Sequence, residues 1–247
     1  MKKLIGILLL LAVPLAGVAS GHAHLDSANI DLNNKEALHK GAKYFVNYCM
    51  GCHSLQYERW ERMAKDIGLT KEQVMDNLVF TGAKFGETMK NAMPAEDAAK
   101  WFGTAPPDLS LIVRSKKGGP DWLYTYLRSF YLDPSRPFGV NNHVFKDVGM
   151  PHVLWELQGL QKARFRTEKD AEGHEHEVFE GFELVQPGSM SPEEYDAMVR
   201  DLTTFLAYVS EPVKLKRQHL GVWVILFLVV FTVLAYLMKK EYWKDVH

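Results

Sequence analysis

Cysteine is scarce in this chain of 247 residues, which holds only two. Such a chain is not a disulfide scaffold, because those scaffolds are short and rich in cysteine. Charge of either sign is not in excess either, since the formal net charge is −1 at pH 7. Without a basic excess, no nucleic-acid partner is expected. Hydrophobic runs long enough to enter a membrane are confined to the two ends of the chain.

The first hydrophobic run, Leu4–Val18, follows two lysines and precedes several small residues. This order is typical of a secretory signal peptide, and we assign residues 1–23 to it, with cleavage after Ser20 or Ala23. An uncleaved membrane helix is the alternative, but the run is short and Pro14 interrupts it. The chain is therefore expected to be exported into an oxidising space.

The second run, residues 220–238, contains nineteen residues without a charge. As a helix it would span about 28 Å, which matches the hydrocarbon core of a bilayer. Basic residues flank both ends almost equally, so the orientation follows from the exported N-terminus instead. We expect a single-pass protein of the bacterial inner membrane, with its parts in this order: a periplasmic domain at 24–212, a basic linker at 213–219, the membrane helix, and a cytoplasmic tail at 239–247.

The two cysteines lie in the sequence Cys49-Met50-Gly51-Cys52-His53. A structural disulfide would close too small a loop to stabilise a large domain, and zinc would need further ligands from elsewhere. A thioredoxin-like redox pair has this spacing too, but it would lack its usual βαβ context. Two cysteines followed directly by a histidine are the attachment pattern of a c-type haem. The pattern predicts one haem c per chain, attached covalently.

Helical periodicity dominates the rest of the chain. One helix is expected to end at the haem motif. A second helical face is formed by Trp122, Leu123, Tyr126, Leu127 and Phe130. A short helix and a proline-rich corner precede that face, with Asp108 or Ser110 available as a helix cap. Ser191 and Glu194 have the spacing of a capping box, and the helix that they begin should pack on the helix leading into Cys49.

One segment departs from the helical pattern. Residues 162–188 alternate polar and apolar side chains around turn residues at 170–173, which predicts a β-hairpin. Seven acidic residues lie between Glu168 and Glu183, and we interpret them as belonging to a solvated hairpin tip.

A haem that transfers electrons needs a sixth iron ligand, and methionine opposite histidine raises the reduction potential. Most of the methionines lie in the attachment loop, in the predicted membrane helix or at packing positions. Met93 and Met150 both precede a proline, whose fixed geometry can present a side chain from a non-helical segment. Gly149 gives Met150 the better context, because it allows close backbone approach to the ring, but the spacing leaves both candidates open.

Four segments of the chain form an ordered set, followed by one C-terminal membrane helix: YCMGCHSLQYERW, APPDLSLIVRSKKGGPDWLYTYL, VGMPHV and SPEEYDAMVRDLTTFLAYVSEP. With this set, nearly the whole mature chain resembles the cytochrome c1 family. The resemblance implies a mainly α, cytochrome-c-like haem domain with a small β-hairpin insertion and one C-terminal transmembrane helix.

The resemblance also implies the haem-binding residues: thioether bonds at Cys49 and Cys52, and axial iron ligation by His53 and Met150. It places a basic contact to a haem propionate at Lys116, where an arginine is more usual, and Arg114 is the alternative. Lysine is a point charge and cannot form the planar fork of arginine, so this contact differs from the family's usual one.

The function that the resemblance implies is electron transfer in a respiratory cytochrome bc1 complex. The chain would take electrons from a Rieske iron–sulfur protein and pass them to a soluble cytochrome c, while quinol oxidation occurs on cytochrome b and the complex is dimeric. The chain would then be an electron-carrying subunit without catalytic residues of its own. The alternatives are a membrane-anchored monohaem cytochrome c serving another oxidase or reductase, a haem-based gas sensor and a thiol–disulfide enzyme.

Overall fold

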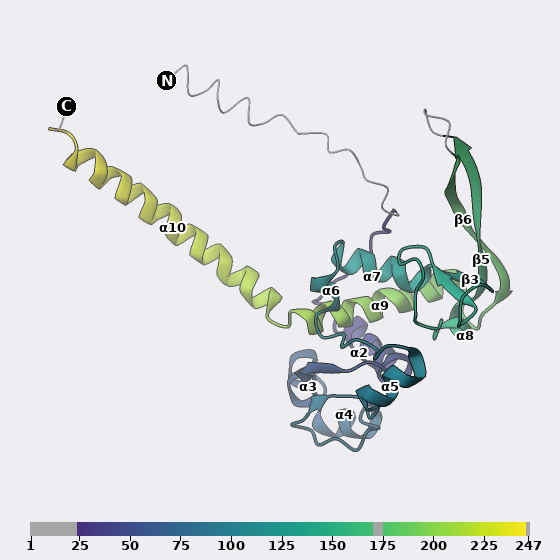
Figure 1. Cartoon of the computed structure of the whole chain (residues 1–247). Helices are drawn as coiled ribbons and strands as arrows, with labels where there is room; N and C mark the ends of the chain where they lie inside the picture. The colour runs from purple at the N-terminus through teal and green to yellow at the C-terminus, as the bar shows by residue number, and fades with distance from the viewer. Residues whose placement is uncertain (1–23, 170–174, 246–247) are drawn as a thin grey trace.

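The computed structural model describes residues 24–169 and 175–245, so the predicted signal peptide at 1–23 lies outside it. Figure 1 shows a helical body from which a hairpin and one long C-terminal helix project. The helices are α2 (Lys35–Tyr44), its π-helical continuation η1 (Phe45–Cys49), α3 (Trp60–Ile67), α4 (Lys71–Asn77), α5 (Ala95–Phe102), α6 (Ile112–Ser115), α7 (Gly119–Arg128), α8 (Trp155–Gln158), α9 (Pro192–Ser210) and α10 (Lys214–Tyr242).

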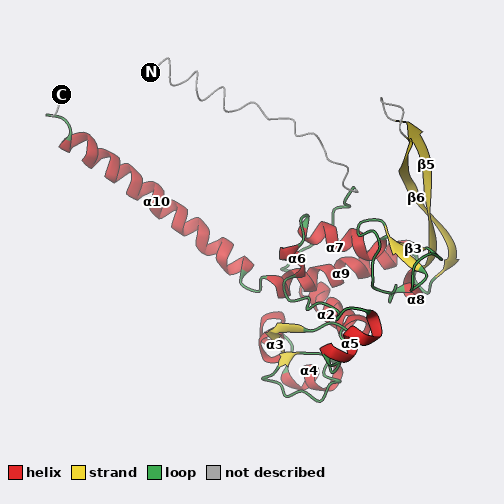
Figure 2. Cartoon of the chain, viewed as in Figure 1, coloured by secondary structure: helices red, strands yellow, loops and turns green. Residues whose placement is uncertain are grey.

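The strands are few and form only two-stranded antiparallel sheets within the described residues (Figure 2). The pairs are β1 (Leu55–Arg59) with β2 (Thr88–Met89), β3 (Phe130–Leu132) with β4 (Val140–Asn142), and β5 (Gly159–Lys169) with β6 (Glu175–Pro187). The mainly α fold class predicted from the sequence is confirmed.

The beginning of α9 follows directly from its sequence. The Ser191 hydroxyl accepts a hydrogen bond from the Glu194 N–H, and the Glu194 carboxylate accepts one from the Ser191 N–H. This reciprocal capping box was predicted and is confirmed. The end of α7 was predicted less well, because the helix stops at Arg128 and Phe130 begins β3 instead of continuing the helical face.

The packing of α2 on α9 is the main helix contact of the body, as the sequence predicted. The two helices approach so closely that a Cβ atom on Gly41 would overlap the backbone carbonyl of Asp201. Phe45 and Phe205 extend the contact, with ring centroids 6.0 Å apart. Because η1 continues α2 without a break, this packing also fixes the position of Cys49.

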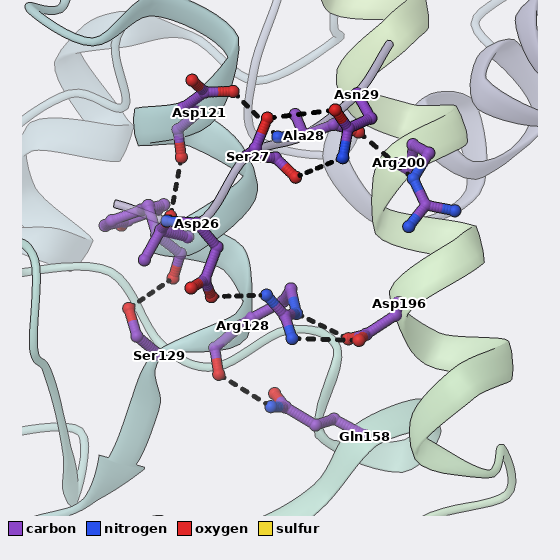
Figure 3. Close-up of polar contacts among 12 residues, drawn as sticks. Asp26, Ser27, Ala28, Asn29, Asp121, Arg128, Ser129, Gln158, Asp196 and Arg200 are labelled. Atoms are coloured by element: carbon purple, nitrogen blue, oxygen red, sulfur yellow. Dashed lines mark hydrogen bonds and ion pairs between the residues drawn. The ribbon is translucent and has the colours of Figure 1, made fainter. Parts of the chain in front are cut away.

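The segment that precedes α2 ties α7 to α9 (Figure 3). Arg128 of α7 forms a two-pronged ion pair with Asp196 of α9, and its third nitrogen donates to Asp26 at 2.7 Å. The Ala28 carbonyl accepts a hydrogen bond of 3.1 Å from Arg200 of α9. Since Arg128 is half-buried, these contacts are less screened than exposed ion pairs and hold α7 in place.

The predicted hairpin is present as β5 and β6, although its turn at 170–173 lies outside the described residues. Aromatic rings attach the hairpin to the body. Tyr131 of β3 lies 6.2 Å from Phe165 and 6.5 Å from Phe182, and His143 stacks on Phe179 at 3.8 Å, all between ring centroids. The hairpin is therefore an insertion that is packed at its base and projects beyond the body (Figure 1).

The C-terminal helix α10 contains the hydrophobic run at 220–238 and none of its residues is buried. It begins at Lys214, so nearly all of the predicted linker at 213–219 is helical. Glu211, Pro212 and Val213 separate it from α9, and the Glu211 carboxylate pairs with Arg217 at 2.6 Å. By length and composition α10 is able to cross a membrane.

One buried carboxyl group lies at the interface of β1, α3 and α9. The Glu58 side chain is 1% exposed, and one of its oxygens has no hydrogen-bond partner. Burial raises the pKa of Glu58 to about 7, even though the nearby Arg62 charge acts in the opposite direction. Asp66, which accepts a hydrogen bond from the Tyr208 hydroxyl at 3.0 Å, adds to the rise. Glu58 therefore keeps its proton to a higher pH than an exposed glutamate does.

The stability contributed by this protonation should depend on pH in a defined direction. Because the pKa is raised from 4.5 in the unfolded chain, the contribution is complete below that value and is lost as pH rises through about 7. Glu58→Gln removes the ionisable group. Between about pH 5.5 and pH 8, the unfolding free energy of this variant should therefore fall by about 2 kcal/mol less than that of the unsubstituted protein.

Denaturation of the detergent-solubilised protein at the two pH values measures this difference. Glu61→Gln is the matched control, because Glu61 is exposed on α3. An undiminished pH dependence in Glu58→Gln would contradict the prediction.

Candidate functional site

A mostly apolar cavity of about 300 Å³ lies in the body. Its walls come from the end of η1 and the following turn, from α7 and α9, from the segment that runs from the end of α5 to Lys116 after α6, and from the loop between β4 and α8. The lining residues are Tyr48, Cys49, Cys52, His53, Phe102, Thr104, Pro106, Pro107, Leu109, Ile112, Lys116, Trp122, Leu123, Tyr126, Leu127, Phe145, Val148, Gly149, Met150, Pro151, Val153, Leu202 and Leu206.

The cavity brings together most of the site residues that the sequence singled out. Cys49, Cys52 and His53 line it together with Met150, which comes from the loop between β4 and α8. Lys116 lines it as well, whereas the exposed Arg114 does not. Met93, the other methionine that precedes a proline, is also absent from the lining. The two methionines that the sequence left open therefore differ clearly in position.

The His53 ring is held in one tautomer. Its Nδ1 lies 2.7 Å from the Pro107 carbonyl oxygen. A carbonyl oxygen only accepts, so Nδ1 carries the hydrogen and Nε2 keeps a free lone pair. Burial lowers the pKa of His53, although the Pro107 bond acts in the opposite direction. The ring is therefore neutral at physiological pH, with Nε2 available to a metal ion.

A row of hydrogen bonds fixes the Pro107 carbonyl beside His53. The Leu109 N–H donates to the Ser54 carbonyl at 2.9 Å. The Asp108 carboxylate accepts from the Gln56 N–H at 2.8 Å and from the Ser110 N–H at 2.9 Å. The segment after the histidine and the segment at 107–110 are thus joined at several points.

These bonds correct one prediction from the sequence, because neither Asp108 nor Ser110 caps a helix. The next helix, α6, has Leu111 at its N-cap and no side-chain cap. The Ser110 hydroxyl instead accepts from the Tyr57 N–H at 3.1 Å, across the same contact. Both side chains satisfy backbone donors of a distant segment instead of the helix that follows them.

The backbone of the cysteine loop is also anchored. The Asn91 side chain donates to the Cys52 carbonyl at 2.6 Å, and its oxygen accepts from the Ser54 hydroxyl at 3.1 Å. Asn91 carries no signal in the sequence, because its partners lie almost forty residues earlier in the chain. The asparagine and Pro107 together position the loop that carries the cysteines and the histidine.

The environment of the two thiols argues against thiol chemistry. Cys49 and Cys52 form no disulfide in the described structure. Burial raises the pKa of the Cys49 thiol to about 12, whereas disulfide exchange requires a thiolate. Within 24–169 and 175–245, no group of three or more His, Cys, Asp or Glu side chains could hold a metal ion, so these residues supply no zinc site that includes the pair.

Three further polar groups of the cavity lining are the Met150 thioether, the Tyr126 phenol and the Lys116 ammonium group. The Tyr126 hydroxyl lies 3.4 Å from the Met150 sulfur. The Lys116 Nζ lies 4.8 Å from the Trp122 ring centroid and 4.9 Å from that of Phe145, which keeps a cation at the apolar wall.

This donor set fits a c-type haem. Apolar walls suit the ring, two unpaired thiols lie beside it, and the free Nε2 of His53 and the sulfur of Met150 are ligand atoms that haem iron accepts.

Comparison with known proteins agrees with this chemistry. A sequence model described as the Cytochrome C1 family matches residues 27–246. Cytochrome c1 of Allochromatium vinosum is 53% identical over 100% of both chains. A protein named ammonia monooxygenase gamma subunit, from Nitrosomonas europaea, is 44% identical over 98% of this chain and 97% of its own. The mitochondrial cytochrome c1 heme protein of Kluyveromyces lactis is 24% identical over 92% of this chain and 77% of its own.

The contact between the histidine segment and residues 107–110 should be sensitive to Asp108. Asp108→Ala leaves two backbone N–H groups without their acceptor and should lower the unfolding free energy by about 1–3 kcal/mol. Asp108→Asn keeps one acceptor oxygen and should lose less. Chemical denaturation followed by circular dichroism measures both variants, and equal stability of Asp108→Ala and the unsubstituted protein would contradict the role given to this carboxylate.

Proposed function

Because the chain belongs to the cytochrome c1 family, we propose that it transfers electrons through one haem c that is attached covalently at Cys49 and Cys52. Membership of this family supports a c-type haem and electron transfer in a bc1 complex. The observation that carries the specific assignment is that both thiols, His53 and Met150 line a single apolar cavity.

His53 and Met150 are proposed as the two axial ligands. When bound, the haem supplies the iron that takes up and releases one electron. His53 presents a neutral ring whose orientation is set by the Pro107 carbonyl, and Met150 presents a soft thioether that favours ferrous iron. The apolar lining excludes water from the ring and therefore also favours the less charged, reduced state. Lys116 is the proposed contact to a propionate, in preference to the exposed Arg114.

The partners follow from the same assignment. We propose that electrons arrive from a Rieske iron–sulfur protein and leave to a soluble cytochrome c, while cytochrome b oxidises quinol in the same dimeric complex. The helix α10 fits a membrane anchor, and we propose that it holds the haem domain on the periplasmic side of a bacterial inner membrane. We propose the same boundaries as from the sequence, with the domain at 24–212 and the span at 220–238; the proposed span lies within α10, which begins at Lys214.

A second candidate function deserves a test because one relative carries a different name. The Nitrosomonas europaea relative is named as a subunit of an ammonia monooxygenase. The alternative is therefore a membrane-anchored monohaem cytochrome c that serves another oxidase or reductase. Purification of the tagged chain from its native membrane separates the two functions. Association with cytochrome b and a Rieske protein supports the first, and association with a different redox enzyme supports the second.

Substitution of the two candidate methionines tests the proposed ligand. Met150→Leu keeps a similar volume but removes the thioether, so the sulfur-to-iron charge-transfer band of the oxidised protein should disappear. The reduction potential should fall, and the ferrous protein should begin to bind carbon monoxide. Met93→Leu is the matched control and should change none of these properties. A band that survives Met150→Leu and disappears in Met93→Leu would refute the assignment.

A further inference from the structure

We infer that Tyr126 is a positioning residue that tunes Met150, by donating its phenolic hydrogen to the sulfur. The Tyr126 Oη lies 3.4 Å from the Met150 Sδ, within hydrogen-bonding distance of sulfur. The inference rests on the proposed function, because it takes Met150 to be an iron ligand. The Met150 sulfur would then have two partners, the iron and the Tyr126 hydroxyl.

A row of rings fixes the direction of the phenol. Tyr126 stacks on Trp122 with centroids 4.9 Å apart and an interplanar angle of 12°. It meets Phe130 edge to face at 5.2 Å and 70°. Phe130 in turn stacks on His152, with centroids 5.0 Å apart and an interplanar angle of 4°. His152 follows Met150 by two residues in the same loop. The rings therefore connect α7 to the loop that carries the sulfur, and they limit the rotation of the Tyr126 ring.

The backbone of Tyr126 is equally constrained. Its carbonyl accepts a hydrogen bond of 2.8 Å from the Asn142 side chain of β4 and another of 3.3 Å from the Ser129 hydroxyl. The residue is 9% exposed, so the phenol has little access to water as an alternative partner. Burial raises the pKa of Tyr126, which keeps the hydroxyl protonated and able to donate at physiological pH.

The chemistry of a thioether gives this contact a consequence for the iron. A thioether sulfur has two lone pairs, so one can bind a metal ion while the other accepts a hydrogen. A hydrogen bond withdraws electron density from the sulfur and makes it a poorer donor. Ferric iron depends on that donation more than ferrous iron does. The phenol should therefore raise the reduction potential, in the way that hydrogen bonds to a ligand tune other metal sites.

Tyr126 would have a purely structural role if only its ring mattered. In that case Tyr126→Phe, which keeps the ring and its stacking on Trp122, would leave the iron unaffected. If the hydroxyl tunes the sulfur, Tyr126→Phe should shift the equilibrium constant for reduction about two- to tenfold toward the oxidised form, where tenfold corresponds to about 59 mV. The charge-transfer band should remain but move in energy.

Redox titration and absorption spectroscopy of the purified haem-loaded chain measure both effects. Tyr124→Phe is the matched control. It lies on the same helix, its ring packs under the Arg128 guanidinium at 4.6 Å, and it does not line the cavity. As a second measurement, fluorotyrosine incorporated at position 126 has a more acidic phenol and should shift the potential in the direction opposite to Tyr126→Phe.

The outcomes separate this inference from the ligand assignment. Loss of the band in Met150→Leu, together with a shifted band and a lower potential in Tyr126→Phe, supports both. Loss of the band in Met150→Leu with an unchanged band and potential in Tyr126→Phe overturns the tuning role alone. A band that survives Met150→Leu overturns the ligand assignment, and the tuning role with it.

Discussion

The hydrogen bond between His53 and the Pro107 carbonyl is the contact on which the rest of the site depends. At 2.7 Å it decides which ring nitrogen carries the hydrogen and which is free. Pro107 lies far from His53 in the sequence, and the hydrogen bonds of Asp108 and Leu109 hold the two segments together. The tautomer of one histidine is thus determined by tertiary structure.

The position of the cysteine loop depends on a second constraint, which is the close approach of α2 and α9. A side chain larger than hydrogen at Gly41 would force the helices apart and move η1, which ends at Cys49. The segment that precedes α2 and the ion pairs of Arg128 hold α7 against α9. Cys49 and Tyr126 therefore lie on two walls of the cavity that both pack against α9.

Features that depend on neighbouring residues could be predicted from the sequence. The capping box at Ser191, the helix that leads into Cys49 and the hairpin of β5 and β6 each have a local signal, because cap spacing and periodicity act over a few residues. Asp108 is of a residue type that often caps helices, but its carboxylate accepts a hydrogen bond from the distant Gln56 N–H instead. The choice between Met93 and Met150 was open for the same reason, since only the folded chain determines which of them reaches the cavity.

We propose that His53 and Met150 bind one iron within the cavity. Anomalous X-ray diffraction at the iron absorption edge, from crystals of the purified haem-loaded protein, locates that iron directly. We expect a single peak per chain, within bonding distance of both the His53 Nε2 and the Met150 Sδ. A peak bonded to the Met93 sulfur, or to any side chain outside the cavity, would contradict it.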